Sequence, residues 1–251
     1  MRLFRKKQKE HFLDKYKGYN PVQSWGELVK HVQWIKTYTD IQVDTIMEIG
    51  ANFAQDADWL AEQFNASPEN IWIFEAHPEI FAAIRKIHPK FNAFNNAVFD
   101  KEQDMTFNMY PLTVSNTGCS SLLEMADASL PTNFGAGNAS GQGTRPYAVK
   151  SIRMDNFMNA HKIKGVDFLK LDAEGVNYEV LLGFCDRLKD VKCIHTESEQ
   201  YDNLAYKGQK ENFTRIKSLL EKAGFEMVFF QKSYSQADSF WVRKDTLKKI
   251  Y

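Results

Sequence analysis

Two carboxylates lie only two residues apart, directly at the end of a predicted buried strand. Residues 166–172 are apolar at most positions; Asp172 closes this stretch and Glu174 follows it. Carboxylates this close repel each other unless a proton, a cation or hydrogen bonds separate them. The pair therefore fits a general base beside an acid that orients it. It also fits two ligands of a hard divalent cation such as Mg²⁺ or Mn²⁺.

Three further polar residues belong with this pair. Lys170 interrupts the apolar stretch, so it either pairs with the acids or extends to the strand end, and a buried ion pair is the structural alternative. His195 and Glu197 lie in the next predicted strand, where either can add a metal ligand. A core histidine and a Glu–Lys ion pair are the alternatives for these two. The catalytic candidates are Asp172, Glu174, His195 and Lys170, and the candidate metal ligands are Asp172, Glu174 and Glu197.

A second candidate site follows the strand predicted at residues 45–49. Gly50 permits backbone angles that other residues resist, and Asn52 and Ala54 are small enough for a ligand to approach the main chain. The helix predicted at residues 55–64 begins directly afterwards. A strand, a turn of small residues and a helix N-terminus form the arrangement with which α/β proteins hold nucleotide-like ligands.

An acid at the end of the next predicted strand supports this interpretation. Glu75 ends the strand predicted at residues 71–75 and lies 25 residues after Gly50. An acid in this position can accept hydrogen bonds from both ribose hydroxyls of an adenosine. The strand predicted at residues 91–98 contains Asn96, which we expect beside Glu75 at the same edge of the sheet.

The alternation of strands and helices predicts an α/β fold with a mostly parallel sheet and helices on both faces. Residues 225–231 and 239–243 predict a final antiparallel pair, and residues 1–43 predict a peripheral helical extension to a domain at 44–251. The apolar face of the extension is predicted at Trp25, Leu28, Val29, Val32 and Ile35. Further elements are strands at 105–110, 147–153 and 191–197 and helices from 78, at 154–158, at 178–183 and at 213–223, the last closed by Gly224.

Residues 113–145 interrupt this regular pattern. The segment is rich in Ser, Gly, Asn and Thr and predicts no strand or helix. A loop of this length inside a compact domain is usually functional or disordered. We expect a loop on the substrate side of the site, with a passive surface insertion as the alternative.

Composition limits the classes of function. With 251 residues, 43% of them apolar, and no net charge, the chain predicts one folded domain and argues against nucleic acid as a partner. Three cysteines without metal spacing indicate a reducing compartment, so we expect a cytoplasmic protein. No stretch is apolar enough to predict a transmembrane helix. The basic segment 1–9 predicts an exposed arm, with weak binding to an acidic surface as the alternative.

Five segments in this order resemble one known family. They are residues 48–55, 74–78, 96–98, 149–157 and 167–175, and together they resemble the FkbM family of S-adenosylmethionine-dependent methyltransferases. The resemblance covers roughly residues 44–200, and the combination of segments is more specific than any one of them. Two positions depart from the family pattern: Glu48 replaces the usual Asp, and Ala54 replaces a usual Gly.

The resemblance implies a Rossmann-like class I methyltransferase fold, with seven strands and an antiparallel C-terminal hairpin. It implies that Glu48, Gly50 and Asn52 line the methionine end of S-adenosylmethionine, that Glu75 binds the ribose and that Asn96 and Ala97 border the adenine. The full predicted cofactor site is Glu48, Gly50, Ala51, Asn52, Gln55, Glu75, Ala76, Asn96 and Ala97. The resemblance also implies an acceptor hydroxyl, since members of this family mostly methylate hydroxyls, often on sugars or on polyketide-type natural products.

The first hypothesis is therefore an O-methyltransferase acting on a sugar or glycoconjugate precursor, such as a small-molecule or nucleotide-linked sugar used in polysaccharide biosynthesis. An NAD(P)-dependent oxidoreductase shares the turn and the ribose acid, but Ala54 stands at the third glycine position of its turn and argues against it. A scaffold without catalysis is the third hypothesis, and it has no need for acids at so many strand ends. Trp25 and Trp34 serve either a homodimer interface or the cover of the sheet.

Overall fold

The structure is a computed structural model that describes residues 25–112, 117–126, 144–199, 205–210, 212–233 and 236–248. The predictions for the basic arm, for the first part of the helical extension and for most of the loop at 113–145 fall outside the described residues. The side chain of Trp25 is also outside them, so its predicted part in a dimer interface or in covering the sheet stays a prediction.

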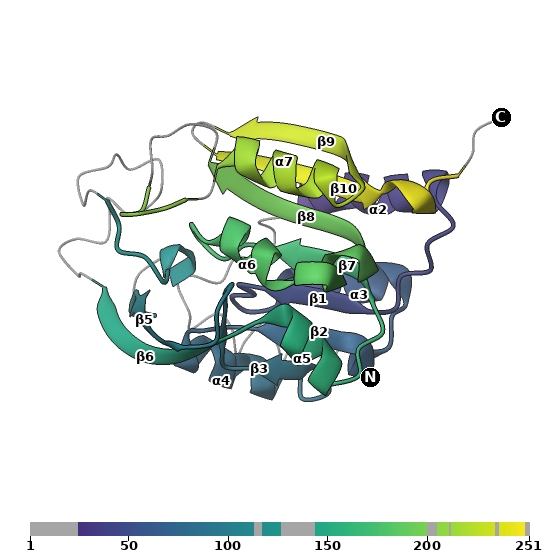
Figure 1. The fold of residues 1–251 in the computed structure, drawn as a ribbon. Coiled ribbons are helices and arrows are strands. Elements are labelled where there is room, and N and C mark those ends of the chain that lie inside the picture. The colour runs from purple at the N-terminus through teal and green to yellow at the C-terminus, as the bar shows by residue number, and fades with distance from the viewer. Residues whose placement is uncertain are drawn as a thin grey trace.

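The central sheet has seven strands in the order β3-β2-β1-β7-β8-β10-β9 (Figure 1). β10 is antiparallel to both β8 and β9, whereas the other neighbours are parallel. The predicted seven-stranded sheet with an antiparallel C-terminal pair is therefore confirmed. The strands are β1 (Ile46–Ile49), β2 (Ile71–Phe74), β3 (Asn92–Phe94), β7 (Val166–Leu171), β8 (Val191–Glu199), β9 (Phe225–Ser233) and β10 (Gln236–Arg243).

Helices lie on both faces of this sheet, as predicted (Figure 1). Among the described residues, one face carries α2 (Trp25–Tyr38), α3 (Gln55–Phe64) and α4 (Pro78–Ile87), and the other carries α5 (Met154–Ala160), α6 (Asn177–Gly183) and α7 (Phe213–Lys222). Pro78 begins α4, where its missing N–H costs nothing, and the Asn212 side chain caps α7 by accepting from Arg215 N–H at 2.9 Å. Short 3₁₀ helices are η1 (Pro68–Asn70), η2 (Thr117–Cys119), η5 (Cys185–Asp190) and η6 (Lys244–Thr246).

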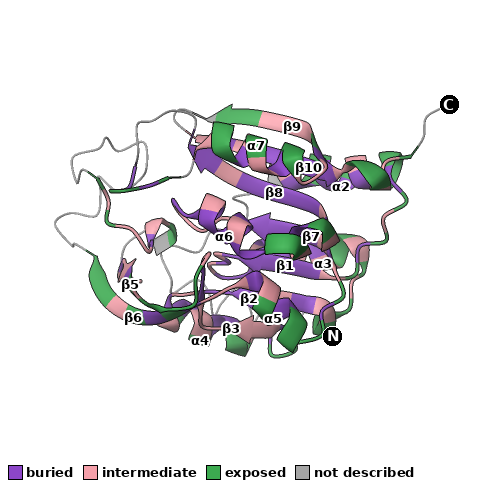
Figure 2. Cartoon of the chain, viewed as in Figure 1, coloured by how far each residue is buried: buried purple, intermediate pink, exposed green. Residues whose placement is uncertain are grey.

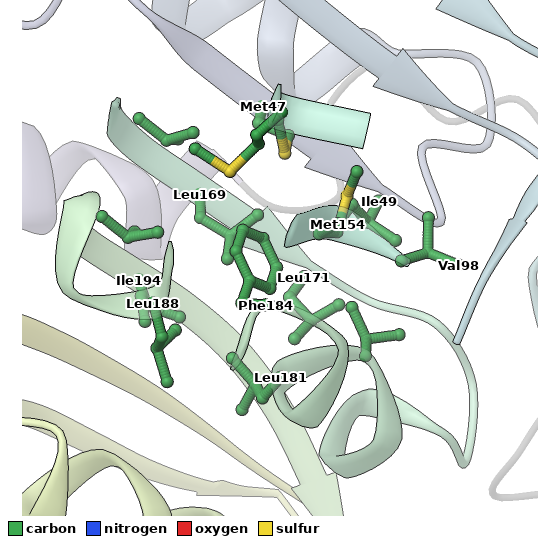
Figure 3. Close-up of a cluster of buried hydrophobic side chains, with 14 of the residues drawn as sticks. Met47, Ile49, Val98, Met154, Leu169, Leu171, Leu181, Phe184, Leu188 and Ile194 are labelled. Carbon is green, nitrogen blue, oxygen red and sulfur yellow. The ribbon is translucent and has the colours of Figure 1, made fainter. Parts of the chain in front are cut away.

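The central strands alternate their side chains between two apolar layers. Figure 3 shows the layer under α5 and α6, in which Met47, Leu169 and Ile194 meet Phe184. Their neighbours in sequence point into the other layer, toward α2, α3 and α4. Figure 2 shows that the central strands are buried along most of their length. Because parallel strands with helices on both faces have no solvent-facing side, polar residues within them are exceptional and their contacts need an explanation.

A second, smaller sheet lies beside the strand ends where the parallel strands finish. It contains β4 (Ala97–Val98), β5 (Asp104–Met109) and β6 (Arg145–Ile152) in the order β4-β6-β5. In Figure 1 the arrowhead of β8 points toward the side on which β5 and β6 lie. The prediction of a single strand at 91–98 is wrong, because this segment forms β3 in the central sheet and β4 in the second sheet. The chain leaves the central sheet after β3 because the Asn95 amide donates to the carbonyls of Glu75 and Ala76, at 2.8 and 3.0 Å.

The described part of the N-terminal extension belongs to the hydrophobic core. Leu28, Val32 and Ile35 of α2 are buried, as the helical spacing predicts, whereas Val29 is 37% exposed. Trp34 packs edge-on against Phe240 of β10, with ring centroids 6.3 Å apart, so it covers the sheet. None of the helices that the structure describes is long and apolar enough to cross a membrane.

Candidate functional site

The turn after β1 brings the chain close to two neighbouring strands. Gly50 has a φ of +73°, and the N–H groups of Gly50 and Ala51 both donate to the Phe74 carbonyl, at 3.1 and 3.2 Å. A Cβ atom at position 50 would lie 1.9 Å from the carbonyl oxygen of Asp172. Glycine is therefore required here by the backbone angle and by space. Ala54 also adopts a left-handed conformation, with φ +55°, at the position where glycine was expected.

Glu75 follows β2 and faces this turn. Its carboxylate accepts hydrogen bonds from the backbone N–H groups of Asn52 and His77, both at 2.7 Å. Burial raises the pKa of Glu75 to about 7, although these hydrogen bonds act in the opposite direction. Two fixed donors leave further lone pairs of the carboxylate for a ligand.

Lys170 connects the end of β7 with α3. Its Nζ lies 3.1 Å from Asp172 Oδ2 and 3.6 Å from Asp56 Oδ2, and its side chain is 5% exposed. Burial acts to lower the pKa of Lys170. The negative charges of Asp172, Asp56 and Glu48 raise this pKa by more than burial lowers it, so the ammonium remains charged. This is the buried ion pair that was the structural alternative for Lys170.

Glu174 is the acid most perturbed by its surroundings in the pocket. It has a φ of +28°, a conformation that L-residues rarely adopt. Its Oε2 accepts a hydrogen bond from the Tyr206 hydroxyl at 2.8 Å, and its backbone carbonyl accepts one from Ser121 Oγ at 2.6 Å. Burial and then the charge of Asp172 raise the pKa of Glu174 to about 8. A carboxyl with such a pKa suits general base chemistry near neutral pH.

A second buried acid lies near Glu174. Glu199, the last residue of β8, is 2% exposed, and its charge contributes to the raised pKa of Glu174. Burial raises the pKa of Glu199 itself to about 7. Its Oε2 has no hydrogen-bond partner among the described residues. This end of the sheet therefore holds several acids that water does not stabilise.

Two segments support Glu174, and one of them belongs to the predicted substrate-side loop at 113–145. Residues 124–126 pair with residues 205–207, through Ala126 N–H to Ala205 O at 2.8 Å and Lys207 N–H to Glu124 O at 2.7 Å. This pairing holds the backbone of Tyr206. The Tyr206 ring packs against Gly175, where an added Cβ atom would lie only 2.7 Å from the ring. Sequence reasoning missed Tyr206 because it follows no strand or helix pattern. Ser121 lies in the polar segment 113–145, whose composition was the only signal for it.

These residues surround one pocket with about 570 Å³ of empty space. Of the predicted site residues, eight line it: Gly50, Asn52, Glu75, Ala76, Asn96, Ala97, Asp172 and Glu174. The described part of the predicted substrate-side loop lines it too. The other lining residues are Ile49, Phe74, Ile80, Val98, Phe107, Gly118, Ser120, Ser121, Leu122, Ala173 and Val176.

Three predicted cofactor residues do not line this pocket. Glu48 is buried, and its Oε2 accepts from the Ala57 N–H of α3 at 3.1 Å. Burial and the charge of Asp56 raise the pKa of Glu48 well above its usual value. Ala51 contributes its N–H to the turn, and Gln55 begins α3. Glu48, Ala51 and Gln55 are therefore outside the lining of the pocket.

His195 and Glu197 were predicted at a strand end, and for His195 this is wrong. β8 runs four residues beyond His195, so the imidazole lies within the sheet, 3% exposed, and Lys170 is its register partner on β7. Glu197 accepts a hydrogen bond from the Gln236 amide of β10. Neither residue lines the pocket.

The predicted metal site is not formed. Asp172, Glu174 and Glu197 are all among the described residues, but they are not a group whose ligand atoms lie within 4.8 Å of one another. Glu174 and Glu197 point to different partners, the Tyr206 hydroxyl and the Gln236 amide. A Mg²⁺ or Mn²⁺ ion held by these three acids therefore does not fit, and no reaction step is assigned to one.

The sheet order, the glycine turn after β1 and the acid after β2 define a class I methyltransferase fold, the class that uses S-adenosylmethionine. Residues 48–227 match the family described as the Methyltransferase FkbM domain. Because this match spans more than half of the chain, the chain belongs to the FkbM methyltransferase family. No match of comparable significance was found among curated protein sequences.

Similar solved structures include the methyltransferase FkbM from Methylobacillus flagellatus KT, with a TM-score of 0.49 and 8% identity over 80% of this chain. The chain spans 44% of that protein, less than half its length. Precorrin-6y C5,15-methyltransferase from Geobacter metallireducens GS-15 has a TM-score of 0.40 and 14% identity, over 87% of this chain and 88% of its own. Aeropyrum pernix fibrillarin with bound S-adenosyl-L-methionine has a TM-score of 0.41 and 12% identity, and the match covers 85% of this chain and 74% of fibrillarin.

Proposed function

We propose that this protein transfers a methyl group from S-adenosylmethionine to a hydroxyl of a sugar or glycoconjugate precursor. One observation carries the proposal: a single pocket is lined both by the residues that we assign to the cofactor and by a pair of acids at the end of β7. The glycine turn and Glu75 lie on one side, and Asp172 and Glu174 on the other. The family match supports the class of enzyme, and the acids support a hydroxyl as the acceptor.

The pocket fits the cofactor in two respects. Asn52 lines it, and its Oδ1 is buried with no hydrogen-bond partner among the described residues, so we assign this oxygen to a donor such as the amino group of the methionine part. The Glu75 carboxylate has lone pairs left for the two ribose hydroxyls. Asn96 and Ala97 border the part of the pocket that we assign to adenine. When bound, the cofactor supplies the activated methyl group on its sulfonium.

Asp172 and Glu174 provide what the acceptor needs. A sugar hydroxyl is a poor acid, and its proton must leave during the transfer. The Glu174 carboxylate takes this proton and becomes the carboxylic acid, and a pKa of about 8 makes it a stronger base than an ordinary carboxylate. The Tyr206 hydroxyl holds Oε2 in place, and Lys170 holds Asp172 beside it. Lys170 therefore acts through Asp172, and His195 has no part in this step.

The chemistry of the pocket also supports the acceptor class. Carboxylate and amide oxygens accept hydrogen bonds from hydroxyls, and the pocket offers Asp172, Glu174 and Asn96. Ser120 and Ser121 line the pocket, which supports the proposal that residues 113–145 select the acceptor. We place the reaction in the cytoplasm, because the three cysteines are free thiols.

The test begins with calorimetric titration of the full chain with S-adenosylmethionine, S-adenosylhomocysteine and NAD. We expect the two adenosyl compounds to bind and NAD not to bind. Glu75→Ala should weaken this binding, whereas Glu69→Ala, an exposed acid before β2, should not change it. Asp172→Ala should keep cofactor affinity. Its transfer of labelled methyl to sugars or nucleotide-linked sugars should fall by about 10²–10⁴-fold.

Four results would contradict the proposal. Binding of NAD alone would favour the oxidoreductase. Labelled methyl found on an amine or a carbon would exclude O-methyl transfer. Near-normal turnover by Asp172→Ala with the true acceptor would remove this acid from the reaction, and cofactor binding without transfer to any acceptor would favour a scaffold.

A further inference from the structure

Three potential metal ligands from distant parts of the sequence meet on the face of the sheet under α2. Glu27 lies in the first turn of α2, His195 in β8 and Asp238 in β10. One ligand atom from each lies within 4.8 Å of the others, and His195 Nε2 is 3.4 Å from Asp238 Oδ1. No other group of three such residues meets this spacing in the part of the chain that the structure describes.

The two carboxylates of this group repel each other unless a proton or a cation separates them. Burial raises the pKa of Glu27, and the negative charge of Asp238 raises it further. Burial also raises the pKa of Asp238, but its contacts with His195 lower it more, so Asp238 stays ionised. A divalent cation would neutralise both carboxylates at once.

A second histidine orients His195 as ligand histidines are oriented in metal sites. The Nδ1 atoms of His195 and His31 are 3.3 Å apart, and the His31 ring stacks on Phe240 with centroids 4.3 Å apart. His31 is 4% exposed, and the Nδ1 of a neutral imidazole in this position accepts a hydrogen bond from His195 Nδ1. When His195 donates from Nδ1 to His31, its Nε2 lone pair points at the two carboxylates. A ligand histidine typically donates its other N–H in this way.

We propose that Glu27, His195 and Asp238 bind a divalent first-row transition-metal ion, of which Zn²⁺ is the natural probe. An imidazole with two carboxylates suits Zn²⁺ better than Mg²⁺ or Ca²⁺, which prefer oxygen ligands alone. Zn–O and Zn–N bonds are about 2.0–2.2 Å, so ligand atoms of one ion lie within about 4.4 Å of one another. The observed spacing of at most 4.8 Å requires only small side-chain movements. Water completes the coordination.

This site is separate from the methyl-transfer pocket, because none of its three residues lines that pocket. Glu27 and Asp238 also lie outside the segment 48–227 that matches the family. The ion joins α2 to β8 and β10, so it fixes the N-terminal helix on the sheet. The proposal does not depend on the proposed function.

The test uses the full chain, treated with EDTA and then freed of it. Calorimetric titration with Zn²⁺ should give one site per chain, and Zn²⁺ should raise the unfolding temperature. Glu27→Gln should weaken Zn²⁺ binding at least tenfold and abolish the rise in unfolding temperature. Asp238→Asn should do the same. Glu197→Gln is the matched control. Glu197 is the register partner of Asp238 on β8, but it is not one of the three residues whose ligand atoms lie close together.

Glu27 is half-buried on a helix, so Glu27→Gln should fold, and circular dichroism checks this. If Zn²⁺ binds neither tightly nor with a thermal shift to the wild-type chain, the proposal is wrong. It is also wrong if Glu27→Gln binds like the wild type, or if Glu197→Gln loses the binding instead. Loss of Zn²⁺ binding in Glu197→Gln would instead place the ion at Glu197, one of the metal ligands predicted from the sequence.

Discussion

At the scale of single residues, Gly50 carries the strictest requirement. Its φ of +73° costs an L-residue about 1–2 kcal/mol, and a Cβ would meet the Asp172 carbonyl oxygen at 1.9 Å. We therefore predict that Gly50→Ala lowers the free energy of unfolding by clearly more than this backbone cost. The turn that holds Asn52 would shift as well, so cofactor affinity should fall. Urea denaturation and calorimetry measure the two effects.

Gly208 offers a matched control for this substitution. It has nearly the same φ, +71°, but a Cβ there would meet nothing within 4 Å. Gly208→Ala should therefore cost only the backbone term of about 1–2 kcal/mol. Equal losses in the two variants would show that the close approach to Asp172 contributes nothing.

The residue scale also separates what the sequence could predict of the site from what it could not. Gly50, Glu75 and Asp172 could be predicted, because residues directly after parallel strands lie at one edge of the sheet. His195 could not be placed, since its position depends on where β8 ends, and β8 extends to Glu199. Tyr206 depends on a contact between segments far apart in the sequence.

At the scale of elements, helix α2 is part of the core. Leu28 is fully buried among residues of the layer under α2, α3 and α4, whereas Val29, its neighbour, is 37% exposed. We predict that Leu28→Ala lowers the free energy of unfolding by about 2–5 kcal/mol, the range for deleting a buried leucine side chain. Val29→Ala should change it by no more than about 0.5 kcal/mol. Urea denaturation of both variants measures the difference.

Equal small effects would mean that α2 is only loosely attached to the domain. The spacing of apolar residues predicted this helix and most of its buried face, because packing on a sheet requires one continuous stripe. The break between β3 and β4 was not predicted. It depends on hydrogen bonds from Asn95 to the chain after β2, which a local pattern does not contain.

At the scale of the whole molecule, buried acids make stability depend on pH. The pKa values of Glu75 and Glu199 are raised to about 7 and that of Glu174 to about 8, from a usual 4.5. A carboxyl with a higher pKa in the folded chain binds extra protons when folded. Its contribution is fully present below pH 4.5 and is lost as the pH rises through its folded pKa. His31 acts oppositely, but only below its usual pKa of 6.5.

We therefore predict that the free energy of unfolding falls as the pH rises from about 6.5 to about 8, by at most ~1.4 kcal/mol per pH unit for each acid. Glu199→Gln keeps the shape of the protonated acid and cannot ionise, so its decrease over this range should be smaller than that of the wild type. Glu226→Gln, on the exposed side of β9, should behave like the wild type. Urea denaturation at several pH values measures this. A wild-type stability that does not fall over this range would mean that Glu75, Glu174 and Glu199 are already ionised in the folded chain. The base assigned to Glu174 would then have an ordinary pKa, and its hydrogen bond with Tyr206 would outweigh the effect of burial.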